Sequence, residues 1–82
     1  MIEDKVKEVI EGVLKEKKIR IDSIKYEKEG NNYFLRIVVD RDKSIDVDTI
    51  VEITKIINPI LDDMDIIKDR YILDISSKEK GE

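Results

Sequence analysis

The stretch YEKEGNNYFLRIVVD, Tyr26–Asp40, decides how this chain folds. Gly30, Asn31 and Asn32 tolerate positive φ angles, which a tight hairpin turn requires. After this turn, aromatic and β-branched residues recur at every second position, a spacing typical of a β-strand. The stretch therefore predicts a β-hairpin whose second strand presents two different faces. One face carries Tyr33, Leu35, Ile37 and Val39, and the other carries Phe34, Arg36 and Val38.

The composition limits the class of protein. The chain has 82 residues, of which 40% are hydrophobic and 44% are charged, enough for one domain with one core. Its net charge of −4 argues against a domain that binds nucleic-acid phosphates on its own, because such domains usually concentrate basic residues on one face. Residues 1–18 do not form the apolar core of a signal peptide, and no apolar run is long enough to span a bilayer. These features predict a soluble cytoplasmic protein that does not contact a membrane.

Two amphipathic helices are predicted on either side of the hairpin. In residues 2–17, apolar residues recur with the helical spacing of three and four. The second helix is expected from Val47 to Met64, with Asp46 as its N-cap. Ile45 and Ile50 then occupy the positions of a hydrophobic staple. The apolar face expected for this helix consists of Val47, Ile50, Val51, Thr54, Ile57, Leu61 and Met64, widened by Ile53 and Ile60.

Two more strands are predicted, one before the turn and one near the end of the chain. In the first, residues 19–28, the alternation of apolar residues slips at Asp22-Ser23. Either a β-bulge restores the inward face there, or Ile19 and Ile21 pack against the first helix before the strand begins. The last strand is expected over residues 71–76, with Ile72 and Asp74 facing outward. Residues 78–82 are expected to form a polar, disordered tail.

These elements predict an α+β fold, a two-layer α-β-β-α-β sandwich formed by residues 1–77. Two helices would cover one face of a three-stranded sheet and leave the other face open. If the third strand neighbours the second, Phe34, Val38 and Ile72 form one apolar patch beside Arg36. A contiguous apolar patch is uncommon on a small domain that acts alone. These four residues are therefore the candidate partner-binding site.

No catalytic or metal site is predicted. The chain lacks His and Cys, so the usual nucleophile–base pairs and zinc ligands are missing, and no P-loop or Rossmann glycine pattern occurs. In residues 40–48, DRDKSIDVD, acidic residues are spaced as in a calcium-binding loop. However, Ile45 and Val51 stand where that loop needs Gly and a bidentate Glu. We expect no enzymatic activity, no cofactor and no metal ion.

Several short motifs carry a resemblance to a known family. They are Tyr26, Lys28-Glu29-Gly30, Tyr33, Leu35-Arg36, Asp40, Ile45-Asp46-Val47-Asp48, Leu61-Asp62, Asp65 and Tyr71-Ile72-Leu73-Asp74-Ile75-Ser76-Ser77. In this order and spacing, residues 2–77 resemble the N-terminal domain of the ribosome maturation factor RimP family. The resemblance implies the same α-β-β-α-β fold. It also implies a bacterial cytoplasmic factor that helps to assemble the small ribosomal subunit without enzymatic activity.

The sequence departs from that family in places. Ser44 stands where the family usually has Gly, and Ser23 and Thr49 stand where it usually has an acid. The family continues into an Sm-like β-barrel domain, which is absent from the sequence up to Glu82. The chain would then be either a domain excised from a longer protein or a naturally short relative.

The leading hypothesis is a non-catalytic, monomeric assembly-factor module that binds a ribosomal protein or a pre-ribosomal particle. Phe34, Val38 and Ile72 would supply apolar area, and Arg36 a charge-assisted hydrogen bond to a carboxylate or phosphate. One alternative is a small KH-like RNA-binding domain, although residues 30–33 lack the second Gly of a GxxG loop and direct RNA contact should be weak. The other is an interaction fragment whose open sheet face docked a missing second domain.

Overall fold

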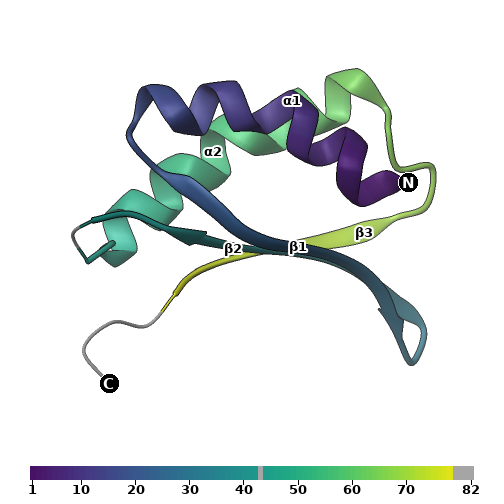
Figure 1. Ribbon diagram of the computed structural model, residues 1–82. Helices are drawn as coiled ribbons and strands as arrows, with labels where there is room; N and C mark the ends of the chain where they lie inside the picture. The colour runs from purple at the N-terminus through teal and green to yellow at the C-terminus, as the bar shows by residue number, and fades with distance from the viewer. Residues whose placement is uncertain (43, 79–82) are drawn as a thin grey trace.

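The computed structural model describes residues 1–42 and 44–78, and Figure 1 shows their arrangement in two layers. Both helices lie on one face of the sheet, and the opposite face is uncovered. The predicted α+β fold and the predicted order of elements are confirmed. Of the predicted tail, only Lys78 falls within the described residues. The elements are α1 (Ile2–Glu16), β1 (Arg20–Glu29), β2 (Asn32–Asp40), α2 (Val47–Met64) and β3 (Tyr71–Ser77).

The sheet has the order β1-β2-β3, so β2 lies at its centre. β1 and β2 pair antiparallel through the predicted turn, where Gly30 adopts a positive φ of 61°. β3 pairs with β2 in parallel, which requires the chain to cross back over the sheet, and α2 provides this crossover. The third strand therefore neighbours the second, which is the condition for a continuous patch on the open face.

A β-bulge in β1 explains the slip in its apolar pattern. Ile21 pairs with Val39, but Ser23 pairs with Val38, so Asp22 is the extra residue in β1. The first of the two alternatives is thus confirmed. Without the extra residue, the apolar side chains that follow it would point away from the helices, because side chains alternate between the two faces.

The core lies between the helices and the sheet and is built from aliphatic side chains. The central strand β2 contributes side chains that are fully buried, as the alternation in its sequence predicted. No helix in the described ranges is long and apolar enough to cross a membrane. The buried residues are Val6, Ile10, Leu14, Ile19, Leu35, Ile37, Val39, Ile53, Ile57, Leu61, Ile67 and Ile75.

The apolar face predicted for α2 is partly wrong. Val47, Val51 and Met64 remain 77%, 45% and 54% exposed, whereas Ile53, Ile57 and Leu61 are buried. Apolar residues surround much of this helix, so the pattern alone did not show which side faces the sheet. The spacing of four residues between the buried positions places them on one face. The N-cap prediction is confirmed, because the Thr49 amide donates to Oδ1 of Asp46 at 2.8 Å.

Candidate functional site: the open face of the sheet

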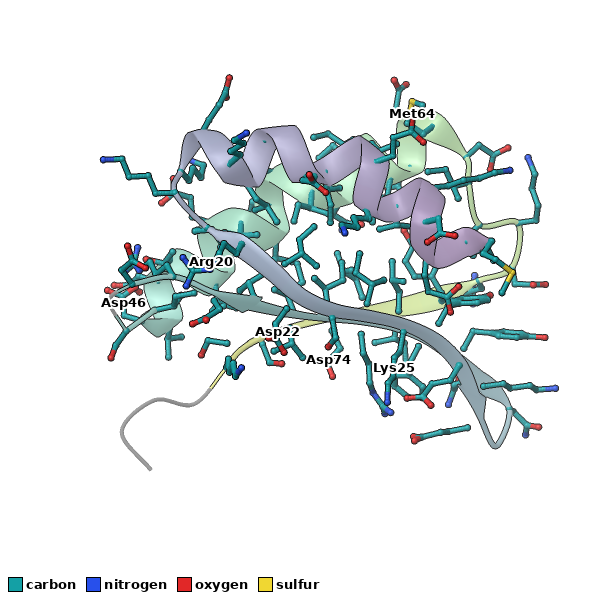
Figure 2. The ribbon with its side chains drawn as sticks, viewed as in Figure 1. Arg20, Asp22, Lys25, Asp46, Met64 and Asp74 are labelled. Carbon is teal, nitrogen blue, oxygen red and sulfur yellow. The ribbon has the colours of Figure 1, made fainter. Side chains whose placement is uncertain are left out.

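The structure brings the four predicted site residues together on the uncovered face of the sheet, here called the open face. Phe34 of β2 pairs with Ile72 of β3, and Arg36 pairs with Asp74. Ile72 is 47% exposed, while Phe34, Arg36 and Val38 are half-buried. Figure 2 shows Asp74 and, on β1, Lys25 on the side of the sheet away from the helices. Arg36 lies between Phe34 and Val38 along β2, so it divides the apolar area into two parts.

Arg36 is held by carboxylates of its own chain. Its Nη1 donates to Glu27 Oε1 at 2.8 Å and to Glu29 Oε1 at 3.0 Å, and its Nη2 donates to Glu29 Oε2 at 3.0 Å. Its Nε lies 3.8 Å from Asp74 Oδ2. The guanidinium also lies over the ring of Phe34, 4.7 Å from its centroid. Arg36 therefore joins all three strands on the open face and fixes the ring of Phe34.

This cluster shifts the ionisation of its members. Hydrogen bonds that Arg36 donates to Glu29 and Glu27 raise its pKa above the usual value. In return, Arg36 holds the pKa of Glu29 below its usual range. The sequence analysis missed these partners of Arg36. The signal was present, because Glu27 and Glu29 occupy alternate positions of β1, as side chains on the same face do.

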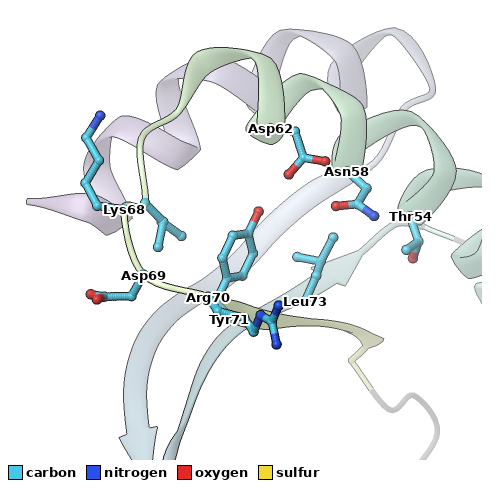
Figure 3. Close-up of a pocket in the computed structure, with 9 residues that line it drawn as sticks. Thr54, Asn58, Asp62, Lys68, Asp69, Arg70, Tyr71 and Leu73 are labelled. Carbon is cyan, nitrogen blue, oxygen red and sulfur yellow. The ribbon is translucent and has the colours of Figure 1, made fainter.

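A groove that the sequence analysis did not predict lies between α2 and β3 (Figure 3). Its volume is about 590 Å³. Burial and then Asp62 raise the pKa of Tyr71, whose ring stands in this groove. The polar row on α2 recurs every four residues, which is the signal that could have revealed it. The α2–β3 groove is lined by Thr54, Asn58, Asp62, Ile67, Lys68, Asp69, Arg70, Tyr71 and Leu73.

The acidic segment from the last residue of β2 to the start of α2 performs a structural role. Asp40 and Asp42 form ion pairs with Arg20 at 3.3 and 3.1 Å, and Asp46 caps α2. Lys43 lies outside the described residues. In the ranges 1–42 and 44–78, no group of three or more His, Cys, Asp or Glu side chains could hold a metal ion.

A two-layer α+β domain with one helix-covered and one uncovered sheet face is the class of protein that this geometry defines. The family model described as the RimP N-terminal domain matches residues 9–78, which is most of the chain. The chain therefore belongs to the RimP N-terminal domain family, as the resemblance of its motifs predicted. The role of this family is in ribosome maturation.

Proposed function

We propose that this chain is a non-catalytic module that assists maturation of the small ribosomal subunit in the cytoplasm. It acts by binding a ribosomal protein or a pre-ribosomal particle through its open face. The observation that carries this proposal is the pairing of Phe34 with Ile72 on neighbouring strands, with Ile72 47% exposed. Apolar side chains of this size gain free energy when a partner covers them.

The residues of the proposed surface contribute in different ways. Phe34, Val38 and Ile72 offer apolar area, and covering each of them is worth on the order of 1 kcal/mol. Arg36 holds the Phe34 ring in place. A charged hydrogen bond that Arg36 gives to a partner replaces one that it makes to Glu27 or Glu29. Such an exchange contributes more to specificity than to affinity.

A double variant, Phe34→Ser with Ile72→Ser, tests the surface. We expect it to retain the fold, because both side chains lie outside the buried core. Its association with small-subunit precursors, measured by quantitative pull-down, should fall at least about tenfold.

The matched control is Val47→Ser with Val51→Ser, which removes two exposed apolar side chains from α2 instead of from the sheet. This control should associate like the unchanged protein. Unchanged association of the first double variant, or an equal loss in both, would remove the open face from the proposed function.

A further inference from the structure

The two edges of the sheet differ in how they are protected. β1 carries the bulge at Asp22, and a bulge is one of the features that keep an edge strand from pairing with another chain. In addition, the backbone amide of Tyr26 donates to Glu3 Oε2 of α1 at 3.2 Å. A backbone donor on the outer side of β1 is therefore already hydrogen-bonded to a side chain of the helix layer. Because of this bond and the bulge, the β1 edge is protected from pairing with a further strand.

Among the residues that the structure describes, nothing protects the edge at β3 in either way. Its register with β2 runs without a break from Tyr71 to Ser77, and no Pro or Lys interrupts it. The Lys78 amide donates to the Val39 carbonyl at 2.8 Å, so it points toward β2. Because alternate residues of a strand direct their backbone groups to opposite sides, those of Leu73 and Ile75 point to the outer edge.

The α2–β3 groove runs beside this edge. Thr54, Asn58 and Asp62, one helical turn apart, form its wall on α2, and Figure 3 shows all three on the side facing β3. Leu73 and Tyr71 line it from the strand. A free strand edge beside a helix wall is the arrangement that binds an extended peptide as an added strand. The strand supplies main-chain hydrogen bonds, and the wall supplies side-chain contacts.

The charges around the edge favour a basic occupant. Within the described ranges, Asp62 and Asp69 form no ion pair, and Asp74 meets only Arg36, at 3.8 Å. Lys68 is held by Asp65 at 2.7 Å, which leaves Arg70 as the opposing cation of the groove. A second copy of the chain is a poor occupant. Asp74 is the middle residue of β3, so full antiparallel self-pairing would set two Asp74 carboxylates side by side.

We propose that the outer edge of β3 and the α2–β3 groove bind an extended segment of a partner protein. The segment is rich in Lys and Arg that alternate with small or β-branched residues, and it adds to the sheet as a fourth strand. This second surface is separate from the open face. A partner that uses both surfaces would bind the open face with its folded body and the β3 edge with an extended basic segment.

The probe for this proposal is a library of random peptides displayed on phage and selected against the full chain, followed by synthesis of the best binder. We expect selected peptides to be basic. On binding, hydrogen exchange should slow at the Leu73 and Ile75 amides. Asp62→Lys should weaken binding at least about tenfold. The matched control, Asp63→Lys, makes the same charge change on an exposed neighbour outside the groove and should leave binding unchanged.

Three results would overturn the proposal. They are the failure to select any basic peptide, protection that maps to the open face rather than to β3, and equal effects of Asp62→Lys and Asp63→Lys. Binding of the selected peptide should survive Phe34→Ser, which alters the open face alone. The outcome for this edge is therefore independent of the outcome for the proposed function.

Discussion

Asp46 shows how much a single side chain contributes to the start of a helix. Its carboxylate accepts the Thr49 amide at 2.8 Å. Hydrogen bonding to the Thr49 side chain, and then to the Thr49 amide, holds the pKa of Asp46 below its usual value of 3.8. A carboxylate whose pKa is lowered by folding stabilises the folded chain while it is ionised. The contribution is present above the usual pKa, and it is lost as the pH falls through the lower pKa of the folded chain.

Asp46→Ala should therefore lower the urea midpoint at pH 7, and the gap to the unchanged protein should narrow below about pH 4. Asp46→Asn is the control, since Asn keeps the capping oxygen but does not titrate. This variant should not show the loss at acidic pH that the Asp46 carboxylate causes. A gap between Asp46→Ala and the unchanged protein that is equally wide at pH 7 and pH 3 would contradict this account.

At the scale of the element, α2 is the helix whose orientation was predicted incorrectly. Its buried positions follow a spacing of four residues, and the polar side chains of Thr54, Asn58 and Asp62 follow the same spacing one position later. The helix thus packs one row against the sheet and turns the next row toward the groove. This rotation removes Val51 from the core and creates the groove wall.

Ile57→Ala and Val51→Ala form a matched pair that tests the orientation of α2. Ile57 is fully buried, so its truncation should lower the free energy of unfolding by about 2–5 kcal/mol. Val51 is 45% exposed, and its truncation should cost less than about 0.5 kcal/mol. Urea denaturation monitored by circular dichroism measures both. Equal costs would mean that the helix faces the sheet differently.

At the scale of the whole molecule, charge separates the proposed function from a direct RNA binder. The net charge is −4, and the arginine at the centre of the open face is held by Glu27 and Glu29. Groups that are already paired release few counterions from a nucleic acid, and counterion release drives nonspecific binding to phosphate.

Filter binding of a single-stranded RNA oligonucleotide to the isolated chain should accordingly give a Kd weaker than about 10⁻⁴ M. The affinity should change little with salt concentration. A variant with Glu27→Gln and Glu29→Gln removes two of the negative charges that neutralise Arg36 and serves as a positive control, with tighter and more salt-dependent binding. A steep salt dependence for the unchanged chain would instead favour the KH-like alternative.

Much of this fold could be predicted from the sequence because the signals are local. Side-chain alternation marked both faces of β2, and Asp46 marked the start of α2. A slip in the alternation of β1 gave the bulge at Asp22 as one of two alternatives. Each signal depends on the backbone geometry of a few consecutive residues. The same alternation predicted that Phe34, Arg36 and Val38 lie on the open face.

Sequence by itself determined which side chains share a face of each strand, where the elements begin, and the family to which the motifs belong. Tertiary structure alone decided that β3 lies beside β2, that Arg36 is held by Glu27 and Glu29, and that a groove opens along α2. These features join segments that are distant in the chain. Their relative placement depends on how α2 packs across the sheet, because local backbone preferences carry no information about which distant surfaces will meet.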